Sequence, residues 1–429
     1  TLYFYIRLKM LETYLNTLEL VSIEVDTLKA NMIMNKIAHE AKITVCLHFE
    51  HGTDFEKIKA MAKTEERSLL ADQLFYKILS APICENYEFT EPSDYSEINA
   101  LKEEYAFEKT TLTDEALRNK IAGAWIGRIC GCLLGKPVEG IRSDEFIPLL
   151  KDSGNYPLSR YILSTDITDS MCDSFKFDLK NKCYADTVHG MPVDDDTNYV
   201  VLAQKIIEDY GKDFKPKDVA KAWIKTQSRE SYFTAERVAF DNFIKGYMPP
   251  YSAMYKNPYR EWIGAQIRGD YFGYINPGNP EKAAEMAFRD ASISHVKNGI
   301  YGEMWVSAML ACAAVTDNIE DIIRGGLAQI PATSRLFKVI EDIINDFNNG
   351  KTYDDCIEKI HKLFNEHTGY GWCHTIPNAM IVAAALLYGE GEPSKIKKLA
   401  RKYNLPEKSL FAMVISCPNG KVEVLQEFL

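Results

Sequence analysis

Three consecutive aspartates, Asp194, Asp195 and Asp196, are the residues of this 429-residue chain with the clearest capacity for chemistry. They lie in the run MPVDDDTNYVVLAQKII, and each carboxyl group is ionised at neutral pH. Two such charges about 5 Å apart repel each other by roughly 3 kcal/mol at an effective dielectric constant near 20. A protein that concentrates this repulsion in a buried place usually holds a cation there. Oxygen ligands alone favour magnesium, calcium or manganese over zinc.

The segment after the triplet indicates where the aspartates lie. Apolar residues recur there at helical spacing, and Gly211 follows as a stop signal. The triplet is therefore expected at the N-terminus of a helix over residues 194–210. Acidic residues at this position are also ordinary helix caps, and the helix dipole favours them. The local sequence leaves metal binding and simple capping both open.

A second chemical signal is a stripe of glycines in the helix predicted over residues 115–135. Each interior glycine costs roughly 0.5–1 kcal/mol relative to alanine, so the stripe requires a reason. Close approach to another helix and close approach to a ligand are the two explanations that remain. Glu139 follows just beyond the end of this helix. The stripe has four members at four-residue intervals: Gly123, Gly127, Gly131 and Gly135.

Further polar residues stand at predicted junctions between loops and helices. His295 lies in RDASISHVKNGIYGEMW, and His374 lies in GYGWCHTIPNAM beside Tyr370. In IGAQIRGDYFGY, Gln266 and Arg268 combine ligand-type groups with apolar neighbours. Arg268 suits a phosphate or carboxylate contact, and a structural ion pair is the alternative. The histidines have the same two interpretations, catalytic or structural.

The elements that would position these residues are helices throughout, because strand signals are scarce and almost every periodic segment has helical spacing. The sequence therefore predicts an all-α protein. Residues 140–190 are rich in Asp, Ser and Tyr and are expected to form an irregular wall of loops, and the segment between Pro249 and Pro280 is expected to be loop-like. Further helices are predicted at 216–227, 231–246, 280–290, 299–315, 319–328, 335–348, 352–366 and 375–388.

Composition excludes several classes of function. The net charge of −11 argues against a nucleic-acid backbone or an anionic membrane surface as the main partner. The ten cysteines are scattered without a CxxC pair, which excludes a zinc ligand set of that kind and favours a reducing, cytoplasmic location. The longest apolar stretches are too short to span a bilayer.

Several of these segments, in order, resemble the ADP-ribosylglycohydrolase family, and in particular its bacterial branch. These all-helical enzymes are related to dinitrogenase-reductase-activating glycohydrolase. IAGAWIGRICGCLLGKPVEG is similar to the family's glycine-rich helix, VDDDTNYVVL to its first metal motif, and IPNAMIVAAALLYGEG to a later block. The resemblance covers residues 113–391 and implies a compact orthogonal helical bundle. Residues 1–112 are then an N-terminal helical extension of unknown role.

The resemblance also implies roles for individual residues. Asp195 and Asp196 take the positions of metal ligands, with Asp194 where threonine or serine is commoner, and the family holds magnesium ions there against the ribose of ADP-ribose. Glu139 matches the acidic residue facing that site, so Glu139 and Asp195 are the expected catalytic residues. The expected substrate-binding residues are Gly135, Gln266, Arg268, His295, Asn298, Gly299, Tyr370 and His374.

One part of the family pattern is missing. After Gly391 the chain lacks the G-G-x-x-D-T-D block whose side chains complete the metal sites, so residues 392–429 are expected to be a divergent tail and the ligand set to be incomplete. The expected function is magnesium-dependent hydrolysis of the glycosidic bond of an ADP-ribosylated protein or of a small ADP-ribosyl or ribosyl substrate. The alternative is a catalytically impaired ADP-ribose-binding module, either a pseudoenzyme or a truncated product.

Overall fold

The computed structural model describes residues 87–156, 158 and 160–389, with the backbone alone at Gly369 and Tyr370. Most of the expected N-terminal extension and the whole expected tail over 392–429 lie outside the described residues. The chain divides into two units, and the site belongs to the unit formed by Glu91–Tyr255 and Tyr259–Leu429. The description below concerns that unit.

The described residues of this unit form helices and contain no strand, which confirms the all-α prediction. The nearest approach to a sheet is an isolated antiparallel bridge between Trp262 and His374. Short 3₁₀ helices occupy Lys136–Val138 (η2), Ser164–Asp166 (η3), Arg229–Ser231 (η4) and Gln266–Arg268 (η5). The α-helices are α6 (Tyr95–Ala100), α7 (Asp114–Gly135), α8 (Ser143–Asp152), α9 (Asp169–Ser174), α10 (Asp195–Tyr210), α11 (Pro216–Thr226), α12 (Thr234–Ile244), α13 (Tyr251–Met254), α14 (Asp270–Tyr274), α15 (Pro280–Ala291), α16 (Asn298–Ala313), α17 (Ile319–Leu327), α18 (Arg335–Asn348), α19 (Tyr353–Leu363), α20 (Gly369–Cys373) and α21 (Thr375–Gly389).

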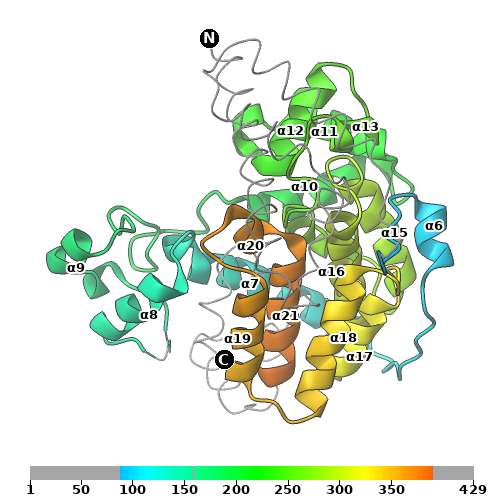
Figure 1. Ribbon diagram of the computed structural model, residues 1–429. Coiled ribbons are helices and arrows are strands. Elements are labelled where there is room, and N and C mark those ends of the chain that lie inside the picture. Colours follow the sequence, from blue (N-terminus) through cyan, green and yellow to red (C-terminus); the bar gives the residue numbers. More distant parts are fainter. Residues whose placement is uncertain (1–86, 157, 159, 390–429) are drawn as a thin grey trace, which may run out of the picture. The chain divides into compact units, whose positions relative to one another are not determined.

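Helix α16 is the centre of the core. Every residue from Asn298 to Cys312 is buried, as expected for a helix that is apolar on all sides. It packs against α14, α15, α17, α18 and α21, and Figure 1 shows it among the last four of these. Because α16 is enclosed, the polar residues at its N-terminus are enclosed as well.

Helix α7 carries the glycine stripe, and the aspartate triplet lies at the start of α10. The two helices pack against each other. The Thr113 side chain caps α7 by accepting a hydrogen bond from the Ala116 amide. Helix α10 ends at Gly211, whose φ of 72° lies in the left-handed region that glycine adopts without strain. The four predicted stripe glycines of α7 are all buried, which confirms that they share an inward face.

The prediction of an irregular wall over residues 140–190 was wrong in part, because that stretch contains α8 and α9. Phe146, Leu149 and Leu150 form the buried face of α8 at helical spacing. Pro148 lies inside the helix and weakens its sequence signal, since proline removes a backbone donor. The loop-like segment after Pro249 likewise contains short helices, namely α13, η5 and α14.

Replacing Gly273 with alanine is expected to lower the free energy of unfolding by about 1–3 kcal/mol. An added Cβ would lie 2.5 Å from Leu310 Cβ and 2.6 Å from the Ser307 carbonyl oxygen, so α14 would have to move away from α16. Urea unfolding followed by circular dichroism measures the change. Gly190→Ala is the matched control, because a Cβ there meets no described atom within 4 Å, and a comparable loss in that variant would contradict the packing account.

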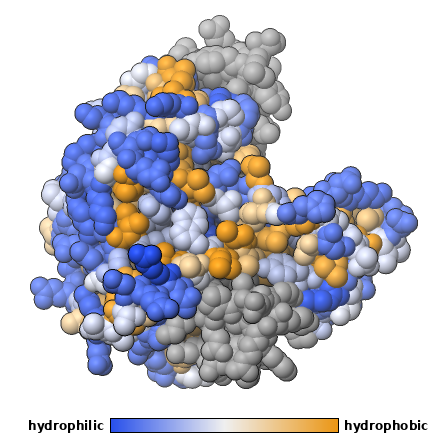
Figure 2. Space-filling model, turned by 180° about the vertical axis from the view of Figure 1, so that it is seen from behind, coloured by the Kyte–Doolittle hydropathy of each residue, from blue (hydrophilic) through white to orange (hydrophobic). Residues whose placement is uncertain are grey.

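None of the helices in the described ranges is long and apolar enough to cross a membrane. Figure 2 shows a face on which hydrophobic residues are interspersed among hydrophilic ones. Val193, the residue directly before the aspartate triplet, is 82% exposed, so the approach to α10 begins with an apolar surface residue.

Candidate metal and catalytic site

The aspartate triplet forms the N-terminus of α10, as predicted. Asp194 is the N-cap residue, and its Oδ1 accepts a hydrogen bond from the Asp196 amide at 3.0 Å. Asp194 and Asp196 are 4% and 0% exposed, whereas Asp195 is partly exposed. Helix capping therefore accounts for the position of one carboxylate oxygen of Asp194. It does not explain why the Asp196 carboxyl group is buried beside it.

Two basic residues of α7 and its extension hold the triplet. The Arg128 Nε donates to the Asp196 carbonyl oxygen at 2.6 Å, and its Nη1 lies 3.0 Å from Asp270 Oδ2. The Lys136 ammonium lies 2.6 Å from Asp194 Oδ2. Burial opposes the charge on Arg128, but the carboxylates of Asp270 and Asp196 outweigh burial and raise the pKa of its guanidinium. The Asp194 and Asp196 carboxylates thus lie beside these two cations, and Asp270 is a further partner of Arg128.

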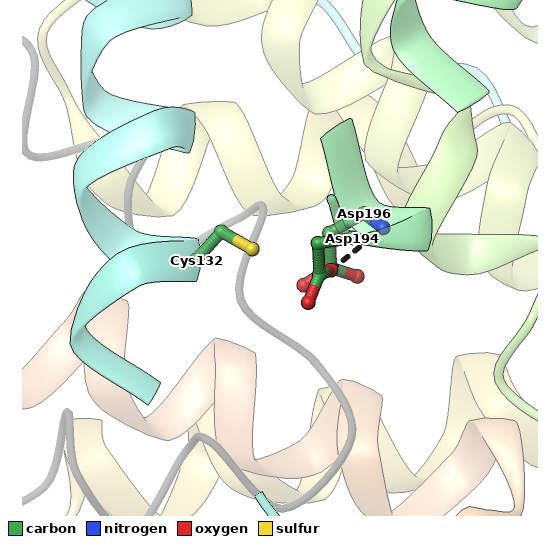
Figure 3. A group of neighbouring side chains, drawn as sticks. All are labelled: Cys132, Asp194 and Asp196. Atoms are coloured by element: carbon green, nitrogen blue, oxygen red, sulfur yellow. Dashed lines mark hydrogen bonds between the residues drawn. The ribbon is translucent and has the colours of Figure 1, made fainter. Parts of the chain in front are cut away.

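Cys132 is a member of this site that the sequence interpretation missed. Its Sγ, one carboxylate oxygen of Asp194 and one of Asp196 all lie within 4.8 Å of one another, and all three residues are buried. Figure 3 shows Cys132 on α7 and the two carboxylates at the start of α10 facing one another. A signal was present in the sequence. Arg128, Cys132 and Lys136 recur at four-residue intervals and so share one helix face.

Glu139 lies directly after η2 with its side chain exposed to solvent. It stands close to the segment that precedes α21. Burial raises the pKa of the Cys373 thiol to about 12, and the charges of Arg142 and Glu139 also act on that thiol. The Arg142 guanidinium lies 4.1 Å from the centre of the Trp372 ring. Glu139 therefore lies near Cys373, the residue after Trp372, while the Tyr370 side chain lies outside the described residues.

Arg268 is the centre of a buried ionic cluster. Its Nη1 donates to Glu236 Oε1 at 2.9 Å, its Nη2 donates to Ser294 Oγ at 3.0 Å, and its Nε pairs with Asp290. His295 belongs to the same cluster, because its Nδ1 lies 2.8 Å from Ser294 Oγ and its Nε2 lies 3.9 Å from Glu236. Arg268 is 1% exposed and His295 is 0% exposed. The structural ion pair considered for Arg268 is thus present.

Asn298 and His374 lie in a second buried cluster. The Asn298 amide donates to Glu91 and Glu261, both at 2.9 Å, and Arg335 pairs with the same two carboxylates at 2.8 and 2.7 Å. The His374 Nε2 lies 4.0 Å from Glu261 Oε2. These contacts tie the N-terminus of α16 to α18 and to the start of α21.

The remaining predicted substrate-binding residues are buried at helix contacts. Gly135 ends α7, one residue before Lys136. Gly299 allows the Arg260 backbone to pack closely, since a Cβ at Gly299 would lie 2.7 Å from the Arg260 carbonyl oxygen. Gln266 is 1% exposed, and its side-chain amide has no hydrogen-bond partner among the described residues.

Stability is expected to fall as the pH drops from about 6.5 toward 4. Burial lowers the pKa of His374 to about 4, so the folded chain keeps this imidazole neutral while the unfolded chain protonates it below pH 6.5. The unfolded state then binds more protons, and each such histidine removes about 1.4 kcal/mol of stability per pH unit across this window. Burial, together with the charge of Arg268, also lowers the pKa of His295.

Urea unfolding at a series of pH values measures this slope. His374→Asn keeps a hydrogen-bond acceptor near Nδ1, which accepts from the Ile376 amide at 3.1 Å. In this variant the slope of the free energy of unfolding against pH should fall by the contribution of one histidine, about 1.4 kcal/mol per pH unit. An unchanged slope in His374→Asn would mean that His374 takes up no proton on unfolding.

Comparison with known proteins gives one family assignment. Residues 113–405, more than half of the chain, match the family described as ADP-ribosylglycohydrolase. Among curated proteins and among solved structures, the comparisons found no significant match. Hydrolysis of glycosidic bonds to ADP-ribose is the activity for which the family is named, and the acidic site at α10 lies within the matched range. The chain belongs to the ADP-ribosylglycohydrolase family.

Proposed function

We propose that this chain hydrolyses the glycosidic bond of an ADP-ribosylated protein or of a small ADP-ribosyl or ribosyl substrate, with Mg²⁺ as its cofactor. The observation that carries the proposal is the pair of buried carboxylates, Asp194 and Asp196, held at the N-terminus of α10 inside the family match. A lone N-cap would not bury a second carboxylate. A divalent cation, together with Arg128 and Lys136, would stabilise two carboxylates buried side by side.

Asp194, Asp195 and Asp196 are the proposed metal ligands. Their oxygens are of the hard type that Mg²⁺ prefers. A bound Mg²⁺ would polarise a water and orient the ribose hydroxyls. Arg128 and Lys136 would hold the ligands in place, because each forms an ionic contact with one side of the triplet.

Glu139 is the proposed general acid or base. Glycosidic cleavage passes through an oxocarbenium-like transition state, and a carboxyl group assists by moving a proton to the leaving group or from water. Its exposed position after η2 leaves it accessible to a substrate. Asp195 is partly exposed in the first turn of α10 and would assist Glu139 as a ligand of the metal.

The proposed substrate residues divide into two kinds. Tyr370 is proposed to contact substrate directly, and so is the backbone of Gly135 at the buried end of α7. The buried residues are proposed to hold the walls of the site in position through their ionic and packing contacts. These are Gln266, Arg268, His295, Asn298, Gly299 and His374.

The proposed setting is the cytoplasm, with ADP-ribosylated molecules as partners and neither nucleic acid nor membrane as a binding surface. The described cysteines form no disulfide, which supports a reducing compartment, and the net charge of −11 would repel polyanions. The smallest test is to incubate the purified chain with ADP-ribosyl-arginine in Mg²⁺ and to follow free ADP-ribose by chromatography. Glu139→Gln should reduce turnover by about 10²–10⁴-fold with a melting temperature near that of the wild type. Equal turnover in Glu139→Gln would remove that residue from the mechanism.

A further inference from the structure

We propose that Cys132 is a further ligand of this metal site, beside Asp194 and Asp196, so that the site binds a thiophilic divalent cation such as Zn²⁺ or Co²⁺ more tightly than Mg²⁺. This inference rests on the proposed metal site at α10. The sequence alone predicted an oxygen-only ligand set. The structure adds sulfur to it, and that changes the class of metal the site should select.

The geometry already brings the three donors together. Cys132 Sγ and one oxygen each from Asp194 and Asp196 lie within 4.8 Å of one another. Tetrahedral zinc holds sulfur at about 2.3 Å and oxygen at about 2.0–2.2 Å, which places neighbouring ligand atoms roughly 3.5 Å apart. Closing the donors around an ion would require side-chain rotations, including rotation of Asp194, which also caps α10 and pairs with Lys136. The three residues are between 0 and 4% exposed, so few waters would compete with them.

The backbone fixes where each donor can reach. Cys132 lies inside α7, whereas Asp194 and Asp196 belong to the first turn of α10. Arg128 lies one turn before the thiol and donates to the Asp196 carbonyl oxygen. Lys136 lies one turn after the thiol and pairs with Asp194. The same helix face therefore carries the thiol and also positions both carboxylates. Groups that orient the ligands in this way are typical of metal sites.

The chemistry of the donor set decides the preference. Carboxylates alone suit Mg²⁺, which demands six hard oxygen ligands in near-octahedral geometry. A sulfur ligand adds little for Mg²⁺, but it strengthens binding of Zn²⁺ and of metals of similar softness. Within the cluster, one thiolate and two carboxylates make three protein ligands, because Asp195 does not belong to it. A metal bound by three protein ligands retains an open position, as catalytic zinc sites do.

The test is to titrate the full chain with Co²⁺ and to record its absorption spectrum. If Cys132 coordinates the metal, a thiolate-to-cobalt charge-transfer band should appear in the near ultraviolet. Added Zn²⁺ should displace the Co²⁺ and abolish this band. Cys132→Ser should lose the band and bind Zn²⁺ at least about tenfold more weakly, with Mg²⁺ affinity nearly unchanged. Cys130→Ser is the matched control, since it removes a thiol from the same helix without touching the cluster, and it should keep the band.

X-ray absorption of the zinc-loaded wild-type chain tests the same point without any variant, because a zinc–sulfur distance of about 2.3 Å is expected. Bound Co²⁺ without a charge-transfer band, a band that survives in Cys132→Ser, or a zinc shell without sulfur would each overturn the inference. The two proposals can fail separately. A Cys132-dependent band without release of ADP-ribose would refute the proposed hydrolysis alone, and Mg²⁺-dependent hydrolysis without the band would refute the thiolate ligand alone.

Discussion

Replacing Asp196 with asparagine is expected to reduce release of ADP-ribose by at least about 100-fold, because one charged ligand is lost from a site that stabilises developing charge. Asparagine has nearly the same shape, and the Arg128 contact to the Asp196 carbonyl oxygen at 2.6 Å uses the backbone. The fold should therefore survive. Calorimetric titration with Mg²⁺ should show weakened binding in parallel with the lost turnover.

Asp209→Asn is the matched control for this prediction. Asp209 lies in the last turn of α10, and its side chain is 35% exposed and pairs with Lys205. Its replacement should leave turnover and Mg²⁺ affinity unchanged. If Asp196→Asn retained both, the triplet would be a helix cap and the ionic partner of Arg128, with no part in metal binding.

Replacing Arg268 with methionine is expected to lower the free energy of unfolding by about 3–5 kcal/mol, because removal of one partner leaves buried charge without compensation. The guanidinium pairs with Glu236 at 2.9 Å and with Asp290, and Glu303 Oε2 lies 3.6 Å away. Burial and then the charge of Asp290 raise the pKa of Glu303 well above its ordinary value, so the stability deficit of the variant relative to the wild type should shrink as the pH falls and further carboxyl groups protonate.

Chemical denaturation at pH 7 and pH 5 measures both effects. Arg324→Met is the control, because this arginine is 26% exposed and pairs with Glu320 on the surface of α17. An exposed pair contributes about 0–1 kcal/mol, so little loss is expected there. A loss in Arg268→Met no larger than in Arg324→Met would mean that the cluster around Arg268 is dispensable for stability.

Local signals were enough to predict most helices. Thr113 caps α7, Asp194 caps α10 and Gly211 ends it, and each of these acts through neighbours within a few residues. The burial of the glycine stripe also followed from spacing alone, since four-residue intervals place side chains on one face. Helix α8 was not predicted because its apolar face is short and Pro148 lies within the helix.

The surroundings of individual polar residues could not be predicted in the same way. Arg335 pairs with Glu91, which lies 244 positions earlier in the chain, and the partners of Arg268 come from α12, α15 and α16. A polar residue at a helix junction has the same local sequence whether it faces a cleft or a buried ion partner. Cys132 illustrates the same limit, because its proximity to Asp194 and Asp196 depends on how α7 crosses α10.

Release of ADP-ribose is the measurement that tests the account most directly. The full chain would be incubated with substrates carrying ADP-ribose on arginine, on serine and on an acetyl group, in Mg²⁺ and separately in a chelator, and the products separated by chromatography. The account predicts free ADP-ribose from at least one substrate in Mg²⁺, none in the chelator, and at least about 100-fold less from Asp196→Asn. Binding of ADP-ribose without turnover of any substrate, and without any effect of Mg²⁺ or of Asp196→Asn, would contradict it.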